Sequence, residues 1–322
     1  MATELQEEKR PMTATSMPTD CRLLCAATCA YDIADSGVFA PHVSPHYPAV
    51  GWTRVPTAFF AGPDNINACL IGTNRDEGVI LVFRGTLPPT NLDLEPQLRD
   101  WIQDFMAKPV AKPGILAPGM TVHEGFWDAL DSLWPQIIPA LQGLLTPIPK
   151  PKLYVAGHSK GGAMAALAAA RLFFQENITP TAVYLYAAAR AGNSTFVSGF
   201  PSTVPVVRYE HHLDIVPFLP PSLPLIGLAV RAPLLHEVFE EANEWDYTSL
   251  GTLRYIEGDG TVRGDDPLLS GIRVEEILTR VVAGRWVDIA RAHAPWCRDT
   301  LSDGGYMLGV CSTSLCTNQD LG

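Results

Sequence analysis

The sequence predicts an α/β fold in which a mainly parallel central sheet is covered by helices on both faces. Short apolar runs of strand length alternate along the chain with longer helical patterns, which is the order typical of parallel sheets. Nearly half of the 322 residues are apolar (47%) and 18% are charged, so the chain can bury a large core. We expect one such domain over residues 16–322, preceded by a loose tail at residues 1–15.

Six apolar runs have the length and the β-branched or aromatic content of strands, and turn residues bound most of them. The Pro- and Gly-rich stretch 39–64 comes before them, and we expect it to form loops and irregular edge structure. The predicted strands are residues 68–71, 79–83, 153–156, 182–186, 204–209 and 253–256.

Four segments show helical patterns. Residues 20–33 and 162–174 are rich in small and apolar side chains, and residues 272–292 place apolar side chains at helical spacing. The pattern at residues 125–145 contains Pro135 and Pro139, which we expect to kink or split that helix.

Charge and hydropathy exclude several classes of protein. The 34 acidic and 23 basic side chains give a net charge of −11 without any Lys/Arg cluster, which argues against nucleic acid and anionic membrane surfaces. The most apolar stretch, residues 217–235, is interrupted by prolines and cannot form a helix across a bilayer. Because residues 1–20 lack the apolar run of a secretory signal, we expect a cytoplasmic location, with secretion by another route left open.

The seven cysteines fit a reducing compartment better than a disulfide framework. Cys21, Cys25 and Cys29 lie on one face of the first predicted helix, and we interpret them as a packing stripe of small side chains. A bridge from this helix to the C-terminal cysteines stays open for an exported protein. No CxxC pair supports a metal site, so we expect neither a metal nor an organic cofactor.

The segment Gly157–Gly161 has the pattern G-x-S-x-G, with Ser159 at its centre. An apolar strand precedes it and an Ala-rich helix follows, which is the context of a nucleophile elbow in an α/β-hydrolase fold. The two glycines allow strand and helix to approach closely, and the backbone N–H of Lys160 would point at a forming oxyanion from the start of the helix.

A nucleophilic serine needs a base and a group that orients the base. In α/β-hydrolases these follow in the order Ser, Asp or Glu, and His. Asp214 lies just beyond the predicted strand 204–209 and is our choice for the acid, with Glu210 as its competitor. Among the histidines, His293 follows the last predicted strand and is our choice for the base, with His236 as the second candidate.

Several motifs, in the same order along the chain, resemble those of the class-three, fungal-type triacylglycerol lipases of the α/β-hydrolase superfamily. The resemblance runs from about residue 68 to the C-terminus, and it departs from the family pattern at Ala189, where proline is usual, and at Lys160, where leucine is usual. The matching segments are V-F-R-G-T at 82–86, V-H-E-G-F at 122–126, the elbow itself, the strand and A-R-A-G-N at 186–193, D-I-V-P-F-L-P-P at 214–221, and Y-T-S-L-G at 247–251.

The resemblance implies that Thr86 supplies a second oxyanion donor and that a lid follows it, at residues 87–101. Asp93, Glu95, Arg99 and Asp100 make this lid charged, which favours soluble or short-chain esters over an oil surface. The expected activity is that of a lipase or esterase on acylglycerols or other small-molecule carboxylic esters. Phospholipase, feruloyl esterase and acyltransferase activity remain alternatives within enzymes, and a catalytically silent binding or signalling module is the alternative outside them.

Overall fold

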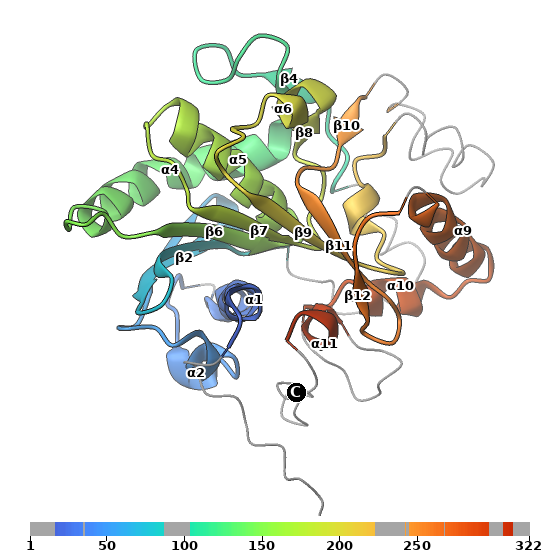
Figure 1. Ribbon diagram of the computed structural model, residues 1–322, viewed down its shortest axis with the longest axis horizontal. Coiled ribbons are helices and arrows are strands. Elements are labelled where there is room, and N and C mark those ends of the chain that lie inside the picture. The colour runs from blue at the N-terminus through green and yellow to red at the C-terminus, as the bar shows by residue number, and fades with distance from the viewer. Residues whose placement is uncertain are drawn as a thin grey trace, which may run out of the picture.

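The computed structural model describes residues 17–34, 36–86, 104–222, 242, 245–266, 268–295 and 305–311. An eight-stranded sheet crosses this part of the molecule in the order β1-β2-β3-β6-β7-β9-β11-β12 (Figure 1). Its five strands from β3 to β11 run parallel, while β1 and β2 at one edge and β12 at the other are antiparallel to their neighbours. The strands are β1 (Thr57–Ala61), β2 (Asn67–Asn74), β3 (Gly78–Phe83), β6 (Leu153–His158), β7 (Ala182–Tyr186), β9 (Val206–His211), β11 (Thr252–Ile256) and β12 (Val262–Arg263).

The predicted fold class is confirmed, and each of the six predicted strands has its counterpart in this sheet. Strand β1 falls inside the stretch that we expected to be irregular. It pairs only with β2 at the sheet edge, and most of its side chains are half-buried. A strand with neither a fully buried nor a clearly alternating face lacks the periodicity that reveals strands in a sequence.

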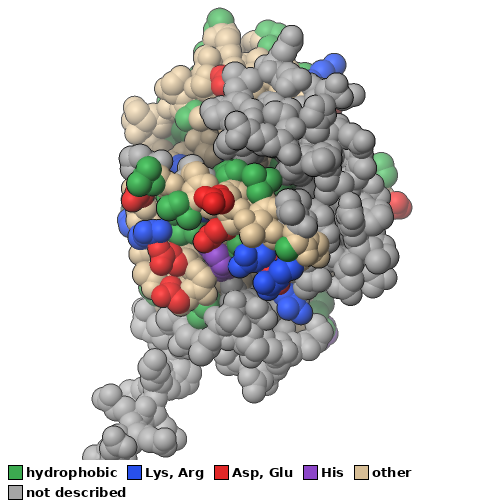
Figure 2. Space-filling model, turned by 90° about the vertical axis from the view of Figure 1, so that its right-hand side faces the viewer, with side chains coloured by type: hydrophobic (Ala, Val, Ile, Leu, Met, Phe, Trp, Pro, Cys, Tyr) green, Lys and Arg blue, Asp and Glu red, His purple; other side chains and the backbone are tan. Residues whose placement is uncertain are grey.

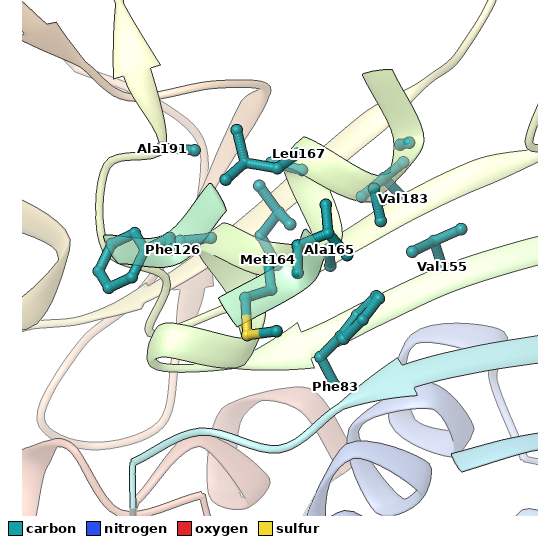
Figure 3. Close-up of a cluster of buried hydrophobic side chains, with 14 of the residues drawn as sticks. Phe83, Phe126, Val155, Met164, Ala165, Leu167, Val183 and Ala191 are labelled. Carbon is teal, nitrogen blue, oxygen red and sulfur yellow. The ribbon is translucent and has the colours of Figure 1, made fainter. Parts of the chain in front are cut away.

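Helices cover both faces of the sheet (Figure 1). Helices α4 (Glu124–Leu144) and α5 (Lys160–Phe174) lie on one face, and α1 (Thr19–Cys29), α2 (Tyr47–Val50) and α11 (Tyr306–Cys311) lie on the other. Figure 3 shows Met164, Ala165 and Leu167 of α5 packed against side chains of β3, β6 and β7. These side chains are buried, and so are Ile80, Val82 and Ala156, which pack with α1 on the other face. The sheet therefore has the two apolar faces that a parallel sheet requires.

Helix α4 is continuous across both of its prolines, contrary to the kink or split that we expected. Pro135 and Pro139 are four residues apart and both are exposed, so they share the solvent face of the helix. The backbone carbonyls left without a donor there can bond to water. Buried residues of the opposite face, such as Leu133 and Ile137, hold the helix against the core.

The predicted helix 272–292 is two helices, α9 (Leu269–Val282) and α10 (Trp286–Ala292). The break occurs at Gly284, whose φ of 67° is left-handed and ends a helix at low cost because glycine has no Cβ. Apolar spacing alone continues through this break, so the sequence pattern overestimated the helix length.

A second, smaller sheet was not predicted. It contains β4 (Pro109–Ala111), β5 (Thr121–His123), β8 (Gly192–Asn193) and β10 (Tyr247–Thr248) in the order β10-β8-β5-β4, beside helix α6 (Ser194–Ser198). Its strands are two or three residues long, too short to show any periodicity in the sequence.

A disulfide joins Cys21 of α1 to Cys311 of α11, across a sequence separation of 290 residues. The two Cα atoms are 4.8 Å apart, within the range for a disulfide. The interpretation of the α1 cysteines as a stripe of free thiols is therefore wrong for Cys21. Cys25 and Cys29 are buried on the same helix and lie outside the disulfide, as a packing stripe predicts.

Candidate active site

Ser159 occupies the turn between β6 and α5, where the sequence predicts a nucleophile elbow. Its φ of 62° and ψ of −131° are strained for any residue with a side chain. The Ser159 N–H donates to the Tyr186 carbonyl at 2.9 Å, which fixes the turn against β7. Its Oγ is buried and has no hydrogen-bond partner among the described residues. The side chain is therefore available for chemistry.

The glycines on either side of Ser159 are required by close backbone contacts. A Cβ on Gly157 would overlap the carbonyl oxygen of Gly161, and a Cβ on Gly161 would overlap the carbonyl oxygen of Phe83 on β3. Side chains at these positions would push the helix away from the sheet. These close backbone contacts explain why the G-x-S-x-G pattern has glycine on both sides of the serine.

The end of β3 lies directly against the elbow. A Cβ on Gly85 would lie 2.7 Å from the His158 carbonyl oxygen and 2.9 Å from Ser159 Cβ, so this glycine permits the approach. Thr86 is the next residue along the chain, and Lys160 opens α5 on the other side of Ser159. The structure thereby brings both predicted oxyanion residues to the neighbourhood of the serine.

The Lys160 side chain has a structural environment of its own. Its Nζ donates to Asn67 Oδ1 of β2 at 3.2 Å. Burial and the nearby Arg84 lower the pKa of Lys160 to about 8, although Asp104 acts in the opposite direction. Helix α5 therefore begins with a buried amine tied to the sheet, while the Lys160 backbone N–H stays at the helix start.

Asp214 and His293, 79 residues apart in the chain, form a buried pair. His293 Nδ1 lies 3.0 Å from each carboxylate oxygen of Asp214, and the Val216 N–H donates to Oδ1 at 3.0 Å. Burial alone would raise the pKa of Asp214. The charge of His293 and the hydrogen bonds to the carboxylate outweigh burial and lower that pKa below its usual value.

Glu210, the competing acid, is committed elsewhere. It forms ion pairs with Arg208, at 2.8 Å, and with Arg273 of α9. These two cations outweigh the effect of burial and lower the pKa of Glu210. Glu210 is thus the centre of a buried ion-pair cluster, while Asp214 meets the histidine.

Two residues without a predicted role, His158 and Tyr31, support the backbone of His293. His158 Nε2 donates to the His293 carbonyl oxygen at 2.8 Å, and the Tyr31 hydroxyl lies 2.7 Å from His158 Nδ1. Burial and the charge of His293 lower the pKa of His158 well below its usual value, so its ring is neutral. A neutral ring that donates from Nε2 must accept at Nδ1, and Tyr31 is therefore the donor.

A third unassigned residue, Tyr306 of α11, donates its hydroxyl to Asp214 Oδ2 at 2.5 Å. It lies 92 residues beyond Asp214 in the chain, in a segment without any motif. Arg190, noted only as part of a motif, holds the loop after Asp214 by donating to the carbonyls of Phe218 and Pro220 at 3.1 Å. Neither role could be inferred from local sequence.

Of the other predicted features, His123 has a structural role and the rest lie outside the described residues. His123 caps α4 by accepting from the Phe126 N–H, and burial lowers its pKa to about 4, consistent with a packing role. The second base candidate His236, the lid segment 87–101, residues 223–235 of the apolar stretch and the N-terminal tail lie outside the described residues.

The described part of the chain holds one group of side chains with metal-ligand spacing, Cys21, Cys25 and Cys311. The disulfide uses two of these three sulfurs, so the group is not suited to an ion.

In the same described part, none of the helices combines the length and apolar character of a membrane span. The face formed around α9 and α10 carries interspersed acidic and basic side chains (Figure 2).

The family model for lipase (class 3) matches residues 80–223, the segment that contains the elbow and Asp214. Curated fungal lipases also match the chain. The lipase of Rhizomucor miehei is 31% identical over 160 residues, which are 48% of this chain and 41% of that protein. Residues 80–223 of the chain are therefore similar to the class 3 lipases.

Other lipases are similar to longer parts of the chain, and solved lipase structures share its fold. The secreted mono- and diacylglycerol lipase A of Penicillium cyclopium is 29% identical over 60% of this chain and 52% of its own. Among solved structures, the Rhizomucor miehei triacylglyceride lipase has a TM-score of 0.54 at 21% identity, over 74% of this chain and 78% of that one. The mono- and diacylglycerol lipase of Aspergillus oryzae has a TM-score of 0.56 at 23% identity, over 76% and 82%.

The chain spans about two fifths of the length of the first curated class 3 lipases that it matches. Relatives from Fusarium solani and Penicillium cyclopium are named as secreted lipases, which contradicts the cytoplasmic location that we expected. The Cys21–Cys311 disulfide agrees with this correction, because disulfides persist in oxidising compartments. The absence of an apolar N-terminal run was a poor guide to location.

Proposed function

We propose that this protein hydrolyses carboxylic esters through an acyl-enzyme on Ser159, with His293 as the base and Asp214 as the group that orients it. The buried Asp214–His293 pair carries the proposal. An aspartate that accepts from Nδ1 holds the imidazole in the tautomer whose Nε2 lone pair is free to take a proton. The pair lies next to the elbow, because His158, the residue before Ser159, bonds to the His293 carbonyl oxygen.

The reaction begins when Ser159 Oγ attacks the ester carbonyl and its proton passes to His293 Nε2. Asp214 stabilises the imidazolium, and the backbone N–H groups of Thr86 and Lys160 donate to the oxyanion, a contribution of about 3 kcal/mol for each well-placed donor. The intermediate collapses to the acyl-enzyme as His293 returns its proton to the departing alcohol. A water molecule, deprotonated by the same histidine, then releases the acid and restores the serine.

The proposed substrates are acylglycerols and other carboxylic esters, with short or soluble esters preferred. The relatives bear lipase names, which supports the ester class. The charged residues of the segment 87–101 support the preference for soluble substrates, because a charged lid presents little apolar surface to an oil droplet. We propose that residues 217–235 supply the apolar wall for the acyl chain.

The test compares hydrolysis of p-nitrophenyl butyrate and palmitate by the wild type, Ser159→Ala and the control Ser198→Ala, whose serine lies exposed on α6. We expect the Ser159 variant to lose at least about a thousandfold in kcat and to stay unlabelled by a fluorophosphonate probe. The control should keep the wild-type kcat and should be labelled. Wild-type turnover by Ser159→Ala would refute the mechanism. A wild type that neither turns over nor reacts with the probe would favour a silent binding module.

The choice of base is tested in the same assay by His293→Ala and His236→Ala. We expect His293→Ala to be nearly inactive and His236→Ala to stay within about threefold of the wild type, since a residue outside the triad contributes little to the barrier. The reverse pattern would move the base to His236 and leave the acyl-enzyme proposal intact.

A further inference from the structure

Helix α11 contacts Asp214 and the two residues after His293 from one turn. The Tyr306 hydroxyl donates to the Asp214 carboxylate at 2.5 Å. The N–H groups of Tyr306 and Met307 donate to the carbonyls of Ala294 and Pro295, the two residues after His293, at 3.1 and 3.0 Å. Acid and base therefore share one support, which comes from the last described element of the chain.

We propose that Tyr306 is a positioning residue for the catalytic acid, and that the Cys21–Cys311 disulfide holds α11 in the place where Tyr306 can act. This inference rests on the triad of the proposed function. It adds that the fixed geometry of the triad depends on a tyrosine and a disulfide that do not touch the substrate.

The direction of the Tyr306 hydrogen bond is determined by its other partner. The His211 N–H donates to the Tyr306 oxygen at 3.0 Å, so the hydroxyl proton is left for Asp214 Oδ2. The Tyr306 side chain is fully buried, and it cannot exchange this bond for one to water. Hydrogen bonds from neutral donors to a buried carboxylate are short and strong, which fits the 2.5 Å distance.

The position of Asp214 decides how well it holds His293. Its two oxygens are equidistant from His293 Nδ1, and the Val216 N–H and the Tyr306 hydroxyl hold one oxygen each. Without the tyrosine donor, the carboxylate can rotate about its bond to Cβ and carries more charge on Oδ2. A more basic carboxylate stabilises the imidazolium, so we expect the acidic limb of the rate profile to move to higher pH.

The groups around the pair do not obscure this pH effect. Burial holds the pKa of His211 at about 3 and that of His158 far below its usual value, while the pKa of Tyr306 is well above its usual value. Glu210 of β9, whose pKa is lowered, and its ion-pair partner Arg273 of α9 also lie near the pair. His212, whose pKa burial lowers, contacts His211.

The disulfide is the covalent anchor of α11. Helix α11 has six residues, which are too few to form a stable helix without tertiary support. Its first turn binds the His293 loop and Asp214, and its last residue, Cys311, is bonded to α1. Loss of the disulfide would free the C-terminal end of α11 and weaken the Tyr306 contact at its other end.

The test compares Tyr306→Phe with Tyr209→Phe, a matched control that removes a tyrosine-to-aspartate hydrogen bond of the same 2.5 Å length, from Tyr209 to Asp20, away from the triad. Both variants are assayed on p-nitrophenyl butyrate from pH 4 to 9, with rates expressed per folded molecule from circular dichroism. We expect Tyr306→Phe to lower kcat about tenfold, to leave KM within about twofold, and to move the acidic limb to higher pH. Tyr209→Phe should keep the wild-type kcat and limb.

The disulfide is tested by Cys311→Ser in a Cys25→Ala background, so that the freed Cys21 cannot pair with its neighbour in the helix. We expect Cys311→Ser to lose less kcat than Tyr306→Phe and to move the acidic limb in the same direction. The variant that combines both substitutions should be no slower than Tyr306→Phe alone. Additive losses would refute the link between disulfide and tyrosine. If Tyr306→Phe fails to fold, the limb shift of Cys311→Ser, or of the wild type treated with dithiothreitol, decides the proposal.

Ser159→Ala, assayed beside these variants, separates this inference from the proposed function. If Ser159→Ala keeps wild-type activity, the proposed function fails. If it is inactive while Tyr306→Phe matches Tyr209→Phe, the inference about α11 fails and the triad stands.

Discussion

Two carboxylates four residues apart at the end of β9, Glu210 and Asp214, pair with different kinds of group. Asp214 faces His293 and two further hydrogen-bond donors, the Val216 N–H and the Tyr306 hydroxyl, whereas Glu210 faces two arginines, one of which, Arg273, is only 2% exposed. The sequence placed both residues near a strand end and could rank them only by distance from the strand. Arg273 comes from α9 and His293 follows α10, and no local pattern reveals these two contacts.

Asp214→Asn and Glu210→Gln should therefore fail in different ways. We expect Asp214→Asn to lower kcat by about 10³- to 10⁴-fold, because an amide permits the wrong tautomer of His293, with most of its folding stability kept. Glu210→Gln should keep its rate per folded molecule but lose about 3 kcal/mol in the free energy of unfolding, since buried arginines lose their counter-charge. Ester turnover and urea denaturation measure the two effects. An inactive but stable Glu210→Gln would reverse the two roles.

At the scale of single residues, the sequence predicted the groups that belong to a motif and missed those that act through distant contacts. Ser159 and its glycines were predictable because a turn with close backbone contacts restricts residue types locally. His158 bonds to His293 across 135 residues and Tyr306 to Asp214 across 92, while Tyr31 bonds to His158 across 127. An isolated tyrosine in a helix carries no signal of such a contact.

At the scale of elements, the contact between β6 and α5 should tolerate no added side chain. Gly157→Ala puts a Cβ into the backbone of Gly161, and we expect a loss of about 3 kcal/mol or more in the free energy of unfolding. Gly143→Ala, an exposed position in α4 with nothing within 4 Å of the new Cβ, should stabilise by about 0.5–1 kcal/mol. Urea denaturation of both variants checks the contrast, and equal stabilities would contradict it.

The predicted elements and the missed elements differ in how locally their cause is encoded. The buried parallel strands are continuous apolar runs, so each is visible in its own sequence. Strand β1, the short second sheet and the break at Gly284 depend on edge pairing or on a single glycine. The exposed prolines of α4 show the converse case, in which tertiary packing overrides a local signal for a break.

At the scale of the whole molecule, acid should destabilise the fold through histidines that are buried in the neutral state. Burial lowers the pKa of His46 and His123 to about 4 and that of His211 to about 3. Their folded pKa values lie below the unfolded value of about 6.5, so the unfolded chain binds more protons between these limits. This contribution to stability is complete above pH 6.5 and is lost as the pH falls through the folded values.

We expect the free energy of unfolding to fall below pH 6.5, by up to about 1.4 kcal/mol per pH unit for each of these histidines. The measurement is urea denaturation between pH 4 and 8. His211→Leu should flatten this dependence, because neither ring nitrogen of His211 has a partner in the part of the chain that the structure describes. A stability that stays level down to pH 4.5 would contradict the expectation.

The Cys21–Cys311 bond also has a consequence for the order of events on the ribosome. Its two halves are separated by 290 residues, so at about 5 to 20 residues per second the second cysteine is made about 15 to 60 s after the first. During that interval Cys21 is a thiol four residues from Cys25 in the same helix. In a nascent chain that is oxidised before Cys311 is made, Cys21 would pair with Cys25 of the same helix, and Cys311 would be left without its partner. Correct pairing therefore requires that oxidation follow the synthesis of Cys311.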